Sequence, residues 1–133
     1  GPLLDRIDIQ VEVTPVSLDD LAAAPKGETS QEIRARVLRA REIQTERFKG
    51  EPSVHCNAQM SARLLEQYAR PDEEGAARLS RAMKALDLSA RAYERILKVA
   101  RTIADLDGAE QIGAAHVAEA VGYRNLDRAS WGE

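Results

Sequence analysis

The sequence is poor in cysteine, in long apolar runs and in net charge, and each shortage excludes a class of protein. Cys56 is the only cysteine among 133 residues, which rules out an internal disulfide and a four-cysteine zinc site. The apolar runs span only a few residues, so we expect no membrane contact and, with a lone thiol, a cytoplasmic location. The net charge of −3 does not favour a nucleic-acid-binding chain.

The residues that are abundant point to a folded helical unit. Apolar residues make up 44% of the sequence and charged residues 31%, a balance typical of a soluble domain. With one tryptophan, three tyrosines and one phenylalanine, the core must be built mainly from alanine, leucine, isoleucine and valine. The length corresponds to one ordinary domain and is too short for two full-sized ones.

A single strand is predicted near the start of the chain. Residues 7–13 alternate apolar and polar side chains, the period-two pattern of a strand with one buried face, and Pro15 ends it. No second strand pattern of similar quality follows, and one strand cannot form a sheet. We therefore expect this strand to belong to a sheet whose other strands are missing. Because the first residue is Gly1 rather than Met, we also expect an excised piece or a processed chain.

The rest of the chain shows helical periodicity interrupted by proline and glycine. Thr29 and Glu32 form a capping pair that opens a long helix, and Pro71 is suited to the first turn of another. Residues 88–106 place their apolar side chains on half of the helix surface, as expected of a central helix packed on two sides. The predicted fold class is all-α, a helical bundle preceded by one orphan β-strand. The expected helices cover residues 18–24, 30–48, 58–70, 71–87, 88–106 and 113–123.

No self-contained active site is recognisable in the sequence. The GxxxxGK[ST] phosphate loop is absent, and so are the HExxH, CxxC and GxSxG motifs. His55 and Cys56 are adjacent, but two neighbouring residues rarely chelate a metal without further ligands, so we predict no metal site. His116 is interpreted as an ordinary histidine of the last helix. The turn at residues 122–125 is interpreted as structural, because the helix after it is too short to fill a DNA major groove.

One position nevertheless suggests anion binding. Ser89 is a good N-cap, which puts Arg91 in the first turn of a helix, where the helix macrodipole disfavours a cation. An arginine there is easier to explain if an anion binds beside it. The pattern is weak by itself, because Ser61 and Arg63 repeat it and an ordinary solvated arginine is the alternative.

Two segments, residues 1–9 (GPLLDRIDI) and residues 88–106 (LSARAYERILKVARTIADL), resemble sequences of one known family. The first is similar to the segment that closes the AAA+ core of the magnesium-chelatase-like ATPases, and the second is close to a signature of that family. Within the family the resemblance is to the bacterial ComM or YifB branch. The resemblance implies an AAA+ lid-like bundle. The implied divisions are 1–15 for the end of the core, 16–29 for a linker with a short helix, 30–123 for the helical lid domain and 124–133 for a tail.

The resemblance also implies functional residues and partners. The arginine finger corresponds to Arg6 and the second-sensor arginine to Arg91, both in catalytic roles, with Arg91 also binding the nucleotide. ATP and Mg²⁺ are then cofactors of the full-length protein, whereas the fragment alone binds neither and is no enzyme by itself. The expected partners are the protein's own AAA+ core and neighbouring subunits in a homo-oligomeric ring, a hexamer. DNA is a further expected partner for a competence-type protein.

A different class of function stays open, a stand-alone helical interaction or nucleic-acid-binding module. Residues 32–49 carry five arginines and one lysine against three glutamates, and such a basic face can attract nucleic acid. A basic helix face is more often a solvated surface or a subunit contact. A phosphate-loop motif upstream of Gly1 would favour the ATPase lid over the stand-alone module.

Overall fold

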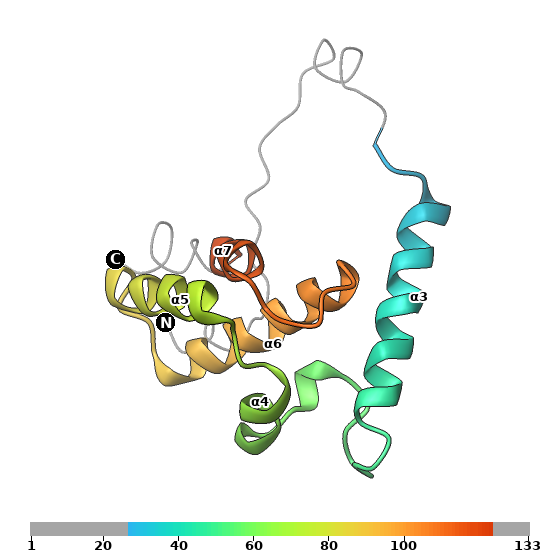
Figure 1. Cartoon of the computed structure of the whole chain (residues 1–133), viewed down its shortest axis with the longest axis horizontal. Helices are drawn as coiled ribbons and strands as arrows, with labels where there is room; N and C mark the ends of the chain where they lie inside the picture. Colours follow the sequence, from blue (N-terminus) through green and yellow to red (C-terminus); the bar gives the residue numbers. More distant parts are fainter. Residues whose placement is uncertain (1–26, 124–133) are drawn as a thin grey trace.

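The computed structural model describes residues 27–123, and this part of the chain is helical (Figure 1). The all-α class predicted from the sequence is confirmed for these residues, and no helix among them is both long and apolar enough to cross a membrane. The predicted strand over residues 7–13, the short helix over 18–24 and Arg6 lie outside the described residues. In chain order the elements are α3 (Ser30–Arg47), the 3₁₀ helix η1 (Asn57–Gln59), α4 (Ala62–Tyr68), α5 (Glu73–Ala85), α6 (Ala90–Leu106) and α7 (Ala114–Gly122).

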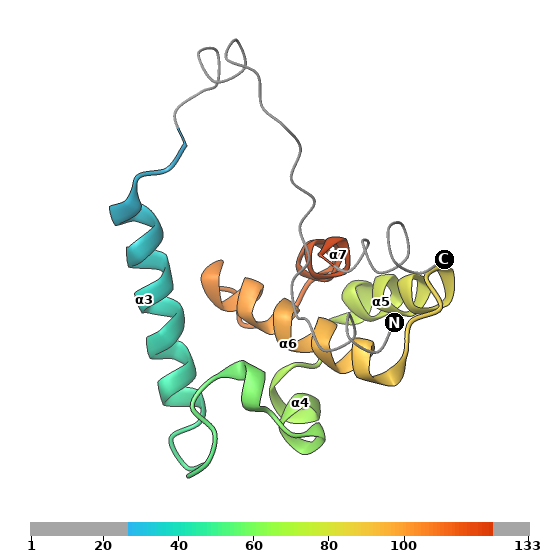
Figure 2. The ribbon, with the colours of Figure 1, turned by 180° about the vertical axis from the view of Figure 1, so that it is seen from behind.

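The central helix of the bundle is α6, as its half-cylinder of apolar residues predicts. It contacts α3, η1, α4 and α7, and both ribbon views show it between α4 and α7 (Figures 1 and 2). Its buried side combines Ile96 with the small residues Ala92, Ala100 and Ala104, none of which is exposed. Small side chains at these positions let the neighbouring helices approach α6 closely.

Aliphatic side chains contributed by several elements close the core around α6. Burying one leucine, isoleucine or valine contributes about 1.5–3 kcal/mol relative to leaving it exposed. The rings of Phe48 and Tyr68 add an edge-to-face contact, with their centroids 5.9 Å apart. The largest fully buried apolar side chains are Leu64, Ile96, Ile112 and Val117.

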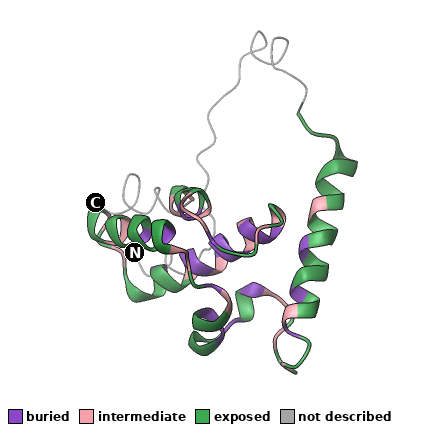
Figure 3. Cartoon of the chain, viewed as in Figure 1, coloured by how far each residue is buried: buried purple, intermediate pink, exposed green. Residues whose placement is uncertain are grey.

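Helix α3 begins at the predicted cap but packs only along its second half. The Thr29 hydroxyl accepts a hydrogen bond from the N–H of Glu32 (3.1 Å), and the Glu32 carboxylate accepts one from the N–H of Thr29 (3.3 Å). Ala40 and Gln44 are buried, whereas Ile33, predicted on the same packed side, is 46% exposed. In Figure 3 the first half of α3 is correspondingly exposed and stands clear of the other helices.

The helix predicted over residues 58–70 is interrupted, so that prediction is wrong in its first turn. Residues 57–59 form η1, Met60 is extended, and α4 starts after Ser61, whose hydroxyl accepts a hydrogen bond from the N–H of Leu64 (3.4 Å). Asn57 and Met60 are both buried. Packing of these two side chains therefore takes precedence over a continuous helix.

The boundaries predicted for the next helix are also wrong. Pro71 lies before the N-cap Asp72, outside the first turn of α5, and forms a parallel bridge with Ile112, whose carbonyl accepts a hydrogen bond from the N–H of Asp72 (2.9 Å). Proline thus marks the start of α5 from outside the helix. The helix ends at Ala85 rather than at residue 87, because Asp87 adopts a φ of 48° that a right-handed helix does not contain.

Candidate functional site

The candidate site lies at the first turn of α6, where the sequence places Arg91. The N-cap Ser89 accepts a hydrogen bond from the N–H of Ala92 (3.1 Å), which confirms the predicted start of the helix. Arg91 is exposed, and the first turn holds no acidic side chain. The positive end of the helix dipole and a solvent-facing guanidinium therefore lie together, a combination that favours an anion.

The structure separates Arg91 from its counterpart in the sequence, Arg63. Arg63 also follows an N-cap serine, but its guanidinium forms an ion pair with Glu51 of the preceding loop (3.0 Å). For Arg91, no hydrogen-bond or ion-pair partner exists within residues 27–123. Of these two arginines, Arg91 is therefore the one whose charge is available to a ligand.

A groove of about 390 Å³ runs along a different side of α6, against α4. It is lined by Leu65 of α4, by Ala69 just after that helix, and by Tyr93 and Leu97 of α6. Tyr93 is 40% exposed. Arg91 is exposed and does not line this groove. An anion held by Arg91 would take its other contacts from groups beyond residues 27–123.

A second arginine of α6 is buried, which the sequence interpretation missed. Arg101 belongs to the polar arc of the helical pattern, yet only 3% of it is exposed. Its guanidinium donates hydrogen bonds to the carbonyls of Tyr68 (3.2 Å), Ala109 (2.7 Å) and Glu110 (2.8 Å). Burial lowers the pKa of Arg101, and the neighbouring Asp105 carboxylate opposes this shift. Arg101 therefore holds the end of α4 and the segment after α6 to the central helix.

Asp105 is the common acceptor in a buried polar network that joins α3 to α6. Its carboxylate accepts hydrogen bonds from Arg47 (2.7 and 2.8 Å), from Arg101 (3.2 Å) and from the amide of Asn57 (2.9 Å). The backbone N–H of Asn57 donates in turn to the side chain of Gln44 (2.9 Å). Because the network is enclosed and its members bind one another, its role is structural.

The sequence contained one signal for this network. Arg101 and Asp105 stand four residues apart on one helix, a spacing at which opposite charges pair. Arg47 belongs to another helix and is 58 residues from Asp105 in the sequence, so no local pattern connects them. Periodicity alone puts all three side chains on the polar sides of their helices.

The histidines of the described segment have structural roles or face solvent. His116 accepts a hydrogen bond from the N–H of Gly113 at Nδ1 (2.9 Å), and its Nε2 lies 2.9 Å from Asp107, so the ring holds the start of α7. His55 is exposed beside the half-buried Cys56. Among the residues that the structure describes, no group of three or more His, Cys, Asp and Glu side chains could hold a metal ion.

Comparison with known proteins identifies the family of the chain. Residues 27–124 match the family model described as Magnesium chelatase, subunit ChlI C-terminal. Competence protein ComM of Haemophilus influenzae is 43% identical over 129 residues, which cover 96% of this chain and 24% of that protein. Uncharacterized protein YifB of Salmonella typhimurium is 40% identical over 130 residues, with the same shares covered. An uncharacterized protein of Mycobacterium tuberculosis is 36% identical over 124 residues, 93% of this chain and 24% of that protein.

These matches confirm the resemblance seen in the sequence, including its ComM and YifB branch. The chain spans about a quarter of the length of these relatives. Arg91 lies inside the range that the family model matches, and Arg6 lies before it. The chain belongs to the magnesium chelatase subunit ChlI C-terminal family, and its helical bundle is the lid domain of a magnesium-chelatase-like protein.

Proposed function

We propose that this chain is the lid of an ATP-hydrolysing AAA+ ring protein and supplies two arginines to its ATP sites. Arg91 is the second-sensor residue and contacts the γ-phosphate, and Arg6 is the arginine finger that reaches the nucleotide of the adjacent subunit. The observation that carries the proposal is the guanidinium of Arg91, exposed and without a partner among residues 27–123, at the start of the central helix of a lid domain.

The start of α6 fits a nucleotide phosphate. A guanidinium is always charged at neutral pH and can donate two parallel hydrogen bonds to phosphate oxygens, and the N-terminus of α6 adds its own positive potential. When bound, ATP supplies the phosphoryl group that is transferred to water. Arg91 orients this group and stabilises its charge. The described residues contain no acidic metal cluster, so in this proposal the ligands of Mg²⁺ lie outside residues 27–123.

The proposal also specifies the partners of the lid domain. A finger that acts on the ATP of another subunit requires neighbours, so the lid contacts its own AAA+ core and adjacent subunits in a homo-oligomeric ring, a hexamer. Lid movement between nucleotide states then communicates the state of one site to the next. One relative is named a competence protein, and on this basis we extend the proposal to DNA as a partner. The cytoplasmic location expected from the sequence is part of the same proposal.

The role of Arg6 can be tested in the full-length protein. We expect Arg6→Ala to reduce ATP turnover by about 10³–10⁵-fold while ATP binding persists, as for other arginine fingers. Mixing Arg6→Ala subunits with subunits that lack the phosphate-loop lysine should restore activity, because some interfaces then contain both intact parts. If rings shown to contain both subunit types recovered no ATPase activity, this result would contradict the action of Arg6 on the ATP site of the neighbouring subunit.

The alternative of a nucleic-acid-binding module is weakened by the contacts of α3. Two of the six cations on residues 32–49 are used within the described chain, since Arg47 pairs with the buried Asp105 and Arg36 pairs with Glu28. The remaining four cations are exposed, three on α3 and one just after it, and they are interspersed with three glutamates. Such a surface is typical of a solvated helix face, and we therefore favour the lid.

A further inference from the structure

Helix α3 is attached to the bundle by polar contacts more than by apolar packing. Of its 18 residues only Ala40 and Gln44 are buried, and Ala40 contributes a single methyl group. By contrast, α6 buries the larger side chains of Ile96, Leu97 and Val99. Because apolar burial is the dominant favourable term in holding elements together, packing holds α3 less firmly than it holds the central helix.

The polar contacts between α3 and the bundle come from the last turn of the helix. Arg47 donates hydrogen bonds to both carboxylate oxygens of Asp105 (2.7 and 2.8 Å) and to the side-chain oxygen of Asn57 (3.0 Å). The side chain of Gln44 accepts a hydrogen bond from the backbone N–H of Asn57 (2.9 Å). The next residue after the helix, Phe48, is buried in the core of the bundle. These contacts lie at one end of α3, and Phe48 fixes that end.

The buried charges at this joint stay balanced without α3. Arg47 and Arg101 share the single carboxylate of Asp105, so the joint holds two cations and one anion. If Arg47 leaves, Arg101 and Asp105 remain as a neutral pair on α6, and Arg101 keeps its bonds to three backbone carbonyls. The charge of Arg47 passes into water. Separation therefore leaves no unpaired charge inside the bundle, which is the usual large cost of breaking a buried ion pair.

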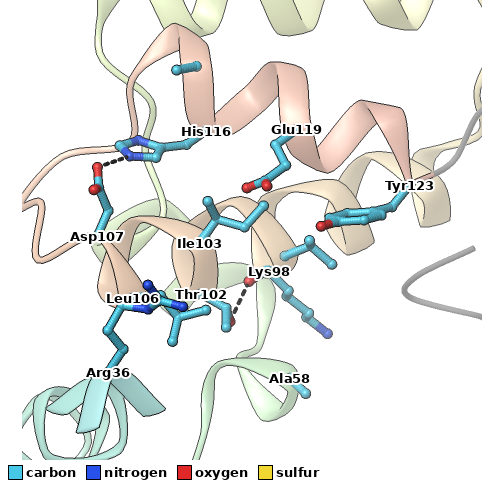
Figure 4. Close-up of a pocket in the computed structure, with 12 residues that line it drawn as sticks. Arg36, Ala58, Lys98, Thr102, Ile103, Leu106, Asp107, His116, Glu119 and Tyr123 are labelled. Carbon is cyan, nitrogen blue, oxygen red and sulfur yellow. Dashed lines mark hydrogen bonds and ion pairs between the residues drawn. The ribbon is translucent and has the colours of Figure 1, made fainter. Parts of the chain in front are cut away.

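Solvent has access to one edge of this joint. A groove of about 780 Å³ opens between α3, α6 and α7, and its lining includes Arg36 of α3 and Thr102 of α6 (Figure 4). The hydroxyl of Thr102 accepts a hydrogen bond from the side-chain amide of Asn57 (3.0 Å). Water that enters the groove can therefore replace the contacts of α3 with Asn57 when they break.

We propose that α3 is a mobile arm that separates from α6 by releasing Arg47 and turns about Phe48, while α4 to α7 stay folded. Arg101 belongs to the bundle and pairs with Asp105 in both states. Separation exposes the polar side of α6, and reattachment covers it again. This movement is independent of the proposed ATPase role, because it depends only on contacts within residues 27–123.

Hydrogen exchange in the full 133-residue chain tests this separation. NMR follows the amides of residues 40–47 and the slowest amides of α6 at increasing urea, under conditions in which each rate follows an opening equilibrium. We expect a smaller urea dependence for residues 40–47 than for α6, because separation of α3 exposes less surface than unfolding does. Equal urea dependence would overturn the proposal, since α3 would then open only when the whole bundle unfolds.

A substitution in the core distinguishes the two openings further. Val117 of α7 is fully buried, and Val117→Ala weakens packing that the bundle keeps while α3 is separated. In this variant we expect the slowest α6 amides to exchange at least about tenfold faster, whereas residues 40–47 keep their rates. Equal acceleration of both helices would contradict a separate movement of α3.

Arg47→Met tests the role of Arg47, because it removes the charge and the hydrogen bonds but keeps an unbranched side chain. Residues 40–47 should then exchange about 10–100-fold faster, the value of one charge-assisted hydrogen bond. The matched variant Arg41→Met changes an exposed arginine of the same helix and should leave these rates unchanged. No acceleration by Arg47→Met, or the same acceleration by both variants, would overturn the proposal. The urea and Val117→Ala comparisons decide the question even if Arg47→Met does not fold.

Discussion

At the scale of single residues, the buried carboxylate of Asp105 is the shared counter-charge of Arg47 and Arg101. We expect Asp105→Asn to lower the free energy of unfolding by about 3–5 kcal/mol, since it leaves two buried guanidiniums without their counter-charge. The control Asp107→Asn, at a side chain that is 68% exposed, should cost less than about 1 kcal/mol. Urea unfolding measures both values, and equal small losses would contradict the importance of the network.

Glu28 gives a prediction on pH. The hydrogen bonds from Arg36 lower the pKa of the Glu28 carboxyl below its ordinary value, and the charge of Arg36 adds to this effect. The pair therefore stabilises the start of α3 above the pKa of an unfolded glutamate, and this stabilisation is lost as the pH falls through the lowered pKa. Carboxyl chemical shifts should show the Glu28 midpoint rise in Arg36→Ala. An unchanged midpoint would mean that the pair does not persist in solution.

At the same scale, the sequence predicts the position of Arg91 at a helix start, but it does not predict what distinguishes Arg91 from Arg63. The tripeptide Ser-Ala-Arg occurs at both Arg91 and Arg63, and the cap serine and the helix start are predictable in each case. The distinguishing contact is the ion pair of Arg63 with Glu51, which a loop brings into place. Such a contact depends on the path of the loop, and local periodicity carries no information about it.

At the scale of elements, α5 begins so close to the bridge between Pro71 and Ile112 that a side chain on Gly75 would be crowded by backbone. A Cβ on Gly75 would lie 3.0 Å from the carbonyl oxygen of Ile112 and 3.1 Å from Cβ of Pro71. We expect Gly75→Ala to lower the free energy of unfolding by about 1–3 kcal/mol, although alanine favours helices. Gly122→Ala at the end of α7, where a Cβ meets nothing within 4 Å, should raise it by about 0.5–1 kcal/mol. Chemical denaturation measures both changes, and a shared sign would contradict this explanation.

Helix starts were the most predictable feature of the elements. The capping pair at Thr29 and the serine at Ser89 placed the starts of α3 and α6 correctly, because capping is a local hydrogen-bond pattern. The break before α4 was not predicted, because it follows from the burial of Asn57 and Met60 against distant parts of the chain. The position of Pro71 outside α5 likewise depends on a bridge to a residue far along the sequence.

At the scale of the whole molecule, composition and periodicity were enough for the all-α class and for the central place of α6. They did not predict that α3 packs along only half its length, because an apolar stripe looks the same whether or not a partner covers it. The proposed ATP site likewise depends on groups that a local sequence pattern does not show. In the proposal, Arg91 is one component of a site whose other parts lie outside residues 27–123, so the proposed role can be tested only in the longer protein.

Comparing ATP and ADP binding in the full-length protein tests most directly whether Arg91 contacts the γ-phosphate. We expect Arg91→Ala to weaken ATP binding by about 10–100-fold, the value of one charge-assisted hydrogen bond, while ADP affinity stays close to that of the unmodified protein. The matched variant Arg63→Ala should leave both affinities unchanged, since Arg63 already pairs with Glu51. Equal weakening of ATP and ADP by Arg91→Ala, or no weakening of either, would contradict the proposed contact.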